Sequence, residues 1–96
     1  MSDTYTDYEL LLNRFLEGEQ SAEEFQHVYL ARFKGEERKL DEPFFELLDG
    51  LFGDVDAFTT DQELIADNPG FYLNEVALRE KVYLVLKQLV RLQQAK

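Results

Sequence analysis

Residues 43–58 read PFFELLDGLFGDVDAF, and this stretch decides the fold class. Its large apolar side chains recur three or four residues apart, which is the spacing of one face of an α-helix. These side chains are Phe44, Leu47, Leu48, Leu51, Phe52, Val55 and Phe58. Asp41 or Glu42 can cap the helix, and Pro43 suits its first turn, where a missing N–H costs nothing. The pattern predicts a helix over about 42–58.

Three further stretches of the chain have the same helical spacing, at about 6–17, 21–34 and 74–93. The second begins with Ser21 and Glu24, a capping box in which each residue satisfies a free backbone N–H of the other. No alternating apolar run bounded by turn residues predicts a strand. We therefore expect an all-α fold, a small antiparallel four-helix bundle, built from residues 1–96 as a single domain.

Two parts of this pattern leave alternatives open. Residues 59–72 are expected to form a long loop, with a short turn of helix near 61–65 and a turn at Asn68-Pro69-Gly70. In the last helix four apolar residues lie off the main stripe. They are Val76, Tyr83, Leu84 and Val90. We expect this helix to be central and buried on two sides, so that a monomer is favoured over a homodimer with its seam here.

The charge of the chain is concentrated in one segment. The chain has 96 residues, 20 Asp and Glu against 10 Lys and Arg, and a formal net charge of −10. Residues 41–78 hold ten of the acids and no Lys or Arg, so the remainder, with ten acids and ten bases, is neutral. An ordinary solvated helix mixes both signs, because ion pairs one turn apart help it. Concentrated like charge speeds encounter with an oppositely charged partner.

Composition excludes several classes of function. There is no Cys, no apolar run of about 20 residues, and a polar N-terminus unlike a signal peptide. We therefore expect a cytoplasmic protein without a membrane segment, one that meets a basic partner. Strong acidity also argues against direct binding of nucleic acid, whose phosphates need cations.

Catalytic and metal chemistry have no support in the residues. His27 is the only histidine and lies off the apolar stripe, and Ser21 is explained as a cap. Asp54 and Asp56 resemble the start of a calcium loop, but Thr59 stands at its glycine position and Ile65 at its bidentate glutamate position. We expect no enzyme, no metal and no cofactor.

The acidic segment has a distinctive helix face. Glu46, Asp49 and Asp56 fall opposite the apolar stripe of the third helix, together with Gly50 and Gly53. Glycine inside a helix costs about 0.5–1 kcal/mol relative to alanine. The face is either a solvated surface or one where small residues let a partner approach the backbone between carboxylates.

The order of these features resembles the colicin D immunity family over about residues 8–92. The resemblance is carried by LLNRFLEG at 11–18, SAEEF at 21–25 and FELLDGLFGDVDAF at 45–58. It implies a four-helix bundle that binds the C-terminal ribonuclease domain of a cognate toxin, which cleaves tRNA in the anticodon loop. It also implies that carboxylates cover the toxin's basic cleft and imitate phosphates.

The positions that match the toxin-facing segment of that family are Asp49, Asp54, Asp56, Asp61 and Glu63. The acids Glu46 and Asp67 complete our predicted partner-binding set. Phe58, Phe71 and Tyr72 are candidate aromatic anchors, although we expect Phe58 in the core. The loop departs from the family at NPGF, residues 68–71, which leaves the toxin's identity open. Two alternatives stay open. The chain is either an acidic nucleic-acid mimic that binds another basic protein, or a structural or regulatory adaptor whose acidity only maintains solubility.

Overall fold

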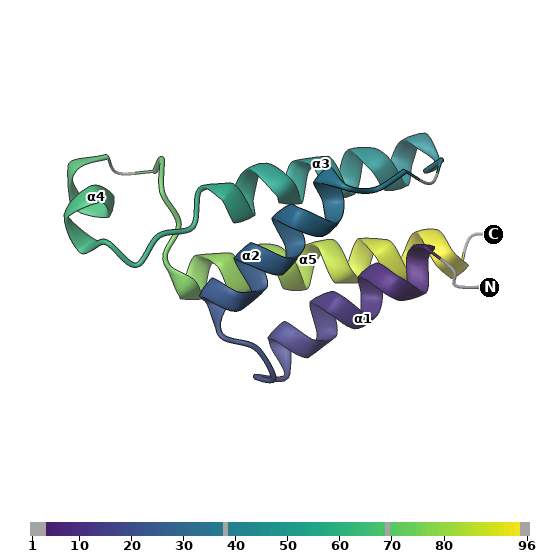
Figure 1. Ribbon diagram of the computed structural model, residues 1–96, viewed down its shortest axis with the longest axis horizontal. Helices are drawn as coiled ribbons and strands as arrows, with labels where there is room; N and C mark the ends of the chain where they lie inside the picture. The colour runs from purple at the N-terminus through teal and green to yellow at the C-terminus, as the bar shows by residue number, and fades with distance from the viewer. Residues whose placement is uncertain (1–3, 38, 69, 95–96) are drawn as a thin grey trace.

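Figure 1 shows the computed structural model, which describes residues 4–37, 39–68 and 70–94. These residues form five helices and no strand. The helices are α1 (Thr4–Leu16), α2 (Ala22–Lys34), α3 (Glu42–Asp56), α4 (Gln62–Asp67) and α5 (Glu75–Gln94). The predicted all-helical class is therefore confirmed. The first and last residues of the four predicted helices agree with those of α1, α2, α3 and α5 to within two residues. The fifth helix, α4, occupies the segment where we expected a loop with one helical turn.

Side-chain caps explain where two of the helices begin. The backbone N–H of Glu24 donates to Ser21 Oγ at 3.1 Å, which is the predicted cap of α2. The N–H of Ala77 donates to Asn74 Oδ1 at 2.8 Å at the start of α5. Ser21 and Asn74 thus precede their helices, which accounts for the one-residue differences from the predicted starts.

The core lies where α5 packs against α1 and α3, while α2 packs mainly against α3. Figure 1 shows α3 and α5 lying side by side along the length of the molecule, with α2 crossing them obliquely. Aromatic rings fill much of the core: Phe15 stacks on Phe25 at 4.4 Å, and Tyr8 meets Phe44 edge-on at 5.9 Å between ring centroids. All four side chains have no exposed surface, which fixes the relative placement of α1, α2 and α3.

Residues 59–72 leave the core and return to it at a narrow base. The N–H of Thr59 donates to the Leu73 carbonyl at 3.0 Å, and the N–H of Leu73 donates to the Ala57 carbonyl at 2.9 Å. Phe58 is buried at this base. We call residues 59–72 the α4 lobe; Figure 1 shows it extending beyond the end of the longer helices. Helix α4 contributes no buried residue to the core. Of the turn predicted at residues 68–70, Pro69 lies outside the described residues.

One expectation about α5 is wrong. Helix α5 is central, because it packs against both α1 and α3, but it is not buried on two sides: Val76, Tyr83 and Leu84 are exposed and Val90 is half-buried. The physical reason is that only α1 and α3 pack extensively against α5 within the described residues, so its remaining face meets solvent. No helix in the described ranges is long and apolar enough to cross a membrane.

Candidate protein-binding surface

The acidic face predicted for α3 is present on the structure. Glu46, Asp49 and Asp56 are exposed, whereas Leu48 and Val55 on the opposite side have no exposed surface. Gly50 and Gly53 lie on the exposed side, and a Cβ atom added at either would meet no atom within 4 Å. We call Glu46, Asp49, Gly50, Gly53 and Asp56 the acidic ridge. The fold itself has no steric need for either glycine.

Two side chains of α2 hold α3 in place beneath the acidic ridge. Gln26 Nε2 donates to the carbonyls of Val55 and Phe58 at 3.0 and 3.1 Å, at and just beyond the C-terminal end of α3. The Tyr29 hydroxyl, fully buried, donates to the Leu48 carbonyl at 2.7 Å. Burial raises the pKa of Tyr29 far above its usual value, with smaller contributions from nearby Tyr8, Asp49 and Asp54. Tyr29 therefore stays a neutral hydrogen-bond donor.

A groove opens between the end of α3 and the α4 lobe. Its volume is about 550 Å³, and its lining residues are Gly53, Asp54, Asp56, Ala57, Phe71 and Tyr72. Phe71 is 69% exposed, and its ring meets that of Tyr72 edge-on at 5.0 Å. The structure thus brings two of the predicted acids together with two of the three predicted aromatic anchors. Phe58, the third, is in the core as expected.

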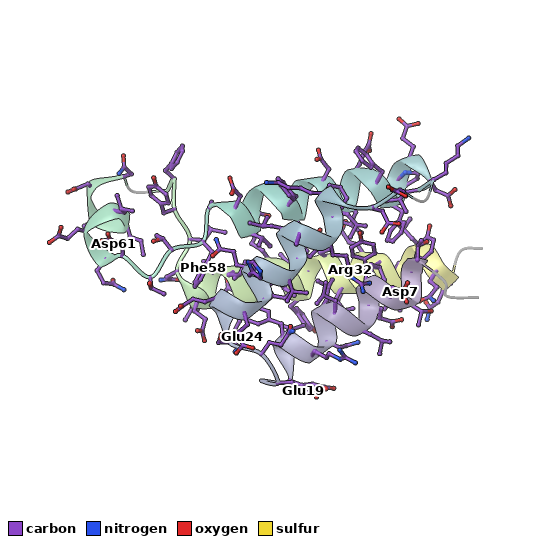
Figure 2. All side chains as sticks on the ribbon, viewed as in Figure 1. Asp7, Glu19, Glu24, Arg32, Phe58 and Asp61 are labelled. Atoms are coloured by element: carbon purple, nitrogen blue, oxygen red, sulfur yellow. The ribbon has the colours of Figure 1, made fainter. Side chains whose placement is uncertain are left out.

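The remaining predicted acids lie apart from this groove. Glu46 lines a second groove, of about 510 Å³, whose other walls include Leu47 of α3 and Arg91 of α5. Asp61, Glu63 and Asp67 belong to the α4 lobe, where all three are exposed. Figure 2 shows Asp61 at the far side of the lobe from Phe58, which marks the base.

Asp61 has a structural role in addition to its charge. Its Oδ1 accepts the backbone N–H groups of Glu63 and Leu64 at 2.9 and 3.2 Å. It is therefore the cap that starts α4.

None of the seven predicted acids has an ion-pair partner within the described ranges. A cation pairs elsewhere with an acid of the 41–78 segment: Arg79 Nε lies 3.3 Å from Glu75 Oε2, one turn apart on α5. The described residues contain no group of His, Asp and Glu able to hold a metal ion. The surface therefore presents unneutralised negative charge, a form suited to a cationic partner.

The acidic ridge also has an aromatic edge that the sequence pattern did not single out. Phe45 is 46% exposed, and its ring centroid lies 5.8 Å from that of Phe33. The signal was available, because Phe45 falls outside the apolar stripe of 43–58. Phe33, on the neighbouring helix α2, is half-buried.

A family model described as bacterial self-protective colicin-like immunity matches residues 4–89. The chain belongs to this family. Membership implies a self-protective role in which this immunity protein binds and inhibits a cognate toxin protein. The matched range includes the acidic ridge and the α4 lobe. Among curated proteins and among solved structures, none matches the chain.

Proposed function

We propose that this immunity protein inhibits a ribonuclease toxin that cleaves tRNA. In this proposal the carboxylates of the acidic ridge, of Asp54 and of the α4 lobe cover the basic RNA-binding cleft in the toxin's C-terminal domain. The observation that carries the proposal is the exposure of acids without partner cations on α3 and the lobe. A cleft that binds RNA is cationic because RNA is anionic, so the same cations can bind these carboxylates.

The geometry of α3 suits such a substitution for RNA. Hydrogen bonds between charged groups are about twice as strong as those between neutral groups. The carboxylates of α3 project from a helix that Gln26 and Tyr29 fasten to α2, so binding orders few backbone atoms. The groove beside Asp54 and Asp56 adds Phe71, whose exposed ring is of the kind found at interface hot spots.

The proposal includes the state and place of the complex. We propose that one copy of the immunity protein, a monomer, binds one toxin domain in the bacterial cytoplasm. The four longer helices act as an antiparallel four-helix scaffold, and no nucleic acid, metal or cofactor takes part. A glycine-bearing face lets the toxin approach the α3 backbone closely between the carboxylates.

The proposal is tested by reversing charge at the groove. Asp54→Lys with Asp56→Lys is compared with Glu17→Lys and Glu19→Lys, a matched pair with the same spacing at the end of α1. Each replacement adds two units of charge, so both variants carry −6 instead of −10. Figure 2 shows Glu19 at the turn between α1 and α2, across the molecule from α3.

The assay is growth of bacteria that express the cognate toxin together with each variant of the immunity protein. We expect the Asp54/Asp56 variant to lose protection and the Glu17/Glu19 variant to retain it. Both pairs lie near helix C-termini, where Lys is favourable, so the melting temperatures should stay close to that of the parent. Protection by the Asp54/Asp56 variant would show that the toxin binds elsewhere.

A further inference from the structure

Phe45 is an exposed aromatic side chain that the proposed contacts leave unused. Its ring lies 5.8 Å from Phe33 on α2, and Phe33 lies 5.6 Å from Phe52. Phe33 and Phe52 are half-buried and pack against the core, whereas Phe45 is 46% exposed. Phe45 is therefore the outer end of an aromatic cluster between α2 and α3, with its side chain held against a fixed neighbour.

The acidic ridge runs directly beside this ring. Asp49 follows Phe45 by four residues on α3, which places the two Cβ atoms about 5–6 Å apart on one helix face. Both side chains are exposed. A partner that neutralises Asp49 from the solvent side must also cover the outer part of Phe45.

Cations already lie over other aromatic rings of this protein, one of them within the same cluster. Arg79 Cζ lies 4.6 Å from the centroid of Phe15, and Lys34 Nζ lies 5.8 Å from that of Phe52. Within the parts of the chain that the structure describes, Phe45 has no such cation and Asp49 has no ion-pair partner. The ring and the carboxylate together are complementary to a planar cation from outside.

We propose that an arginine of the toxin docks here, its guanidinium stacked on Phe45 and hydrogen-bonded to Asp49. The inference rests on the proposed function, because the toxin's RNA-binding cleft supplies the arginine. Arginine fits better than lysine since its planar group can stack on a ring and pair with a carboxylate at once. Exposed charges mainly speed association, whereas a covered stacked pair slows dissociation.

The test replaces the ring while keeping its bulk. Phe45→Leu retains apolar volume without a π face, Phe45→Trp retains the π face, and Tyr83→Leu is the control on the exposed side of α5. Binding to the purified C-terminal domain of the cognate toxin is followed by surface plasmon resonance. We expect Phe45→Leu to raise Kd about tenfold, mainly through faster dissociation, and Phe45→Trp to bind at least as tightly as the parent. Tyr83→Leu should leave Kd unchanged.

Asp49→Asn tests the second half of the contact. We expect Asp49→Asn to raise Kd. Adding Phe45→Leu to it should raise Kd only a little further, because the two residues hold one guanidinium. Equal binding by Phe45→Leu and the parent, or fully additive losses, would overturn the inference. The Asp54/Asp56 variant is measured in the same series. If it binds weakly while Phe45→Leu binds like the parent, the proposed function stands and the arginine contact is wrong.

Sedimentation of the immunity protein alone provides the other decisive readout. We expect the parent and Phe45→Leu to sediment identically, both as monomers. A parent that self-associates, with Phe45→Leu monomeric, would assign this ring to a second copy of the chain and overturn the toxin contact. If Phe45→Leu lowers the melting temperature, the Phe45→Trp measurement still decides whether a π face is required.

Discussion

Replacing Gly50 and Gly53 by alanine should raise the stability of the protein and weaken its binding to the toxin. Both glycines lie inside α3, on its exposed side, and an added Cβ meets nothing within 4 Å at either. Neither has the positive φ that would favour glycine. The two alanines therefore gain helix propensity without a steric penalty.

The expected gain follows from the position of each residue. An interior glycine costs about 0.8–1 kcal/mol relative to alanine, and Gly53 in the last turn of α3 contributes less than Gly50. We expect about 1.5 kcal/mol from both, which raises the melting temperature of a domain of this size by about 6–12 °C. Circular dichroism melts and urea denaturation measure both quantities.

The same methyl groups lie between the carboxylates that we propose face the toxin. If the toxin approaches the α3 backbone there, the two added methyl groups keep it farther from the backbone. We then expect Kd to rise about tenfold, which corresponds to a loss of about 1.4 kcal/mol of binding free energy. Alanine at Gly35, away from the ridge, is unsuitable as a control because its Cβ would lie 3.3 Å from the Ala31 carbonyl. Ala31→Gly on the exposed side of α2 is the better control, with lower stability and unchanged binding. A stabilised double variant that binds the toxin as tightly as the parent would refute close approach at the glycines.

Further predictions concern the two α2 side chains that hold α3. Gln26→Ala removes the hydrogen bonds to the carbonyls of Val55 and Phe58. It should lower the free energy of unfolding, measured by urea denaturation, by about 1–2 kcal/mol. The control is His27→Ala, an exposed change on the same helix, which should alter this free energy by less than about 0.5 kcal/mol. Equal effects would mean that Gln26 does not support α3. Tyr29→Phe removes the 2.7 Å hydrogen bond to Leu48 and should cost about 1 kcal/mol at neutral pH. Because the pKa of Tyr29 is raised in the folded protein, only the unfolded chain ionises there above about pH 10, so the parent loses stability as pH rises further. The stability gap between parent and variant should therefore narrow above pH 10, and a constant gap would contradict the assignment.

Local signals in the sequence were sufficient to place four of the five helices. The spacing of apolar residues and the oxygens of Ser21 and Asn74 act within one or two turns, so their effects do not depend on the rest of the fold. The exposed side of α3 followed from the same periodicity. The apolar stripe of α3 packs into the core, so the acids and glycines on the opposite side of this helix are exposed to solvent.

Tertiary arrangement was harder to predict. The side chains of Val76, Tyr83 and Leu84 have apolar spacing, yet two neighbouring helices cannot surround α5, and so these residues are exposed. The groove beside Asp54 depends on where the α4 lobe returns to the core. Two backbone hydrogen bonds of Leu73, one accepted from Thr59 and one donated to Ala57, hold the chain at that point. Such hydrogen bonds carry no side-chain signature. The periodicity of α3 places Phe45 outside the apolar stripe, but its contact with Phe33 depends on how α2 packs against α3, which local sequence does not show.

The salt dependence of association tests the central claim most directly. Stopped-flow mixing of this immunity protein with the toxin's C-terminal domain measures the association rate constant at increasing NaCl. If the acidic ridge and the α4 lobe meet a cationic cleft, the rate constant falls about tenfold or more between low and high salt. Asp54→Lys with Asp56→Lys should make that dependence clearly shallower, whereas Glu17→Lys with Glu19→Lys should leave it steep. A rate constant that does not change with salt, or equal slopes for the two variants, would contradict recognition through these carboxylates.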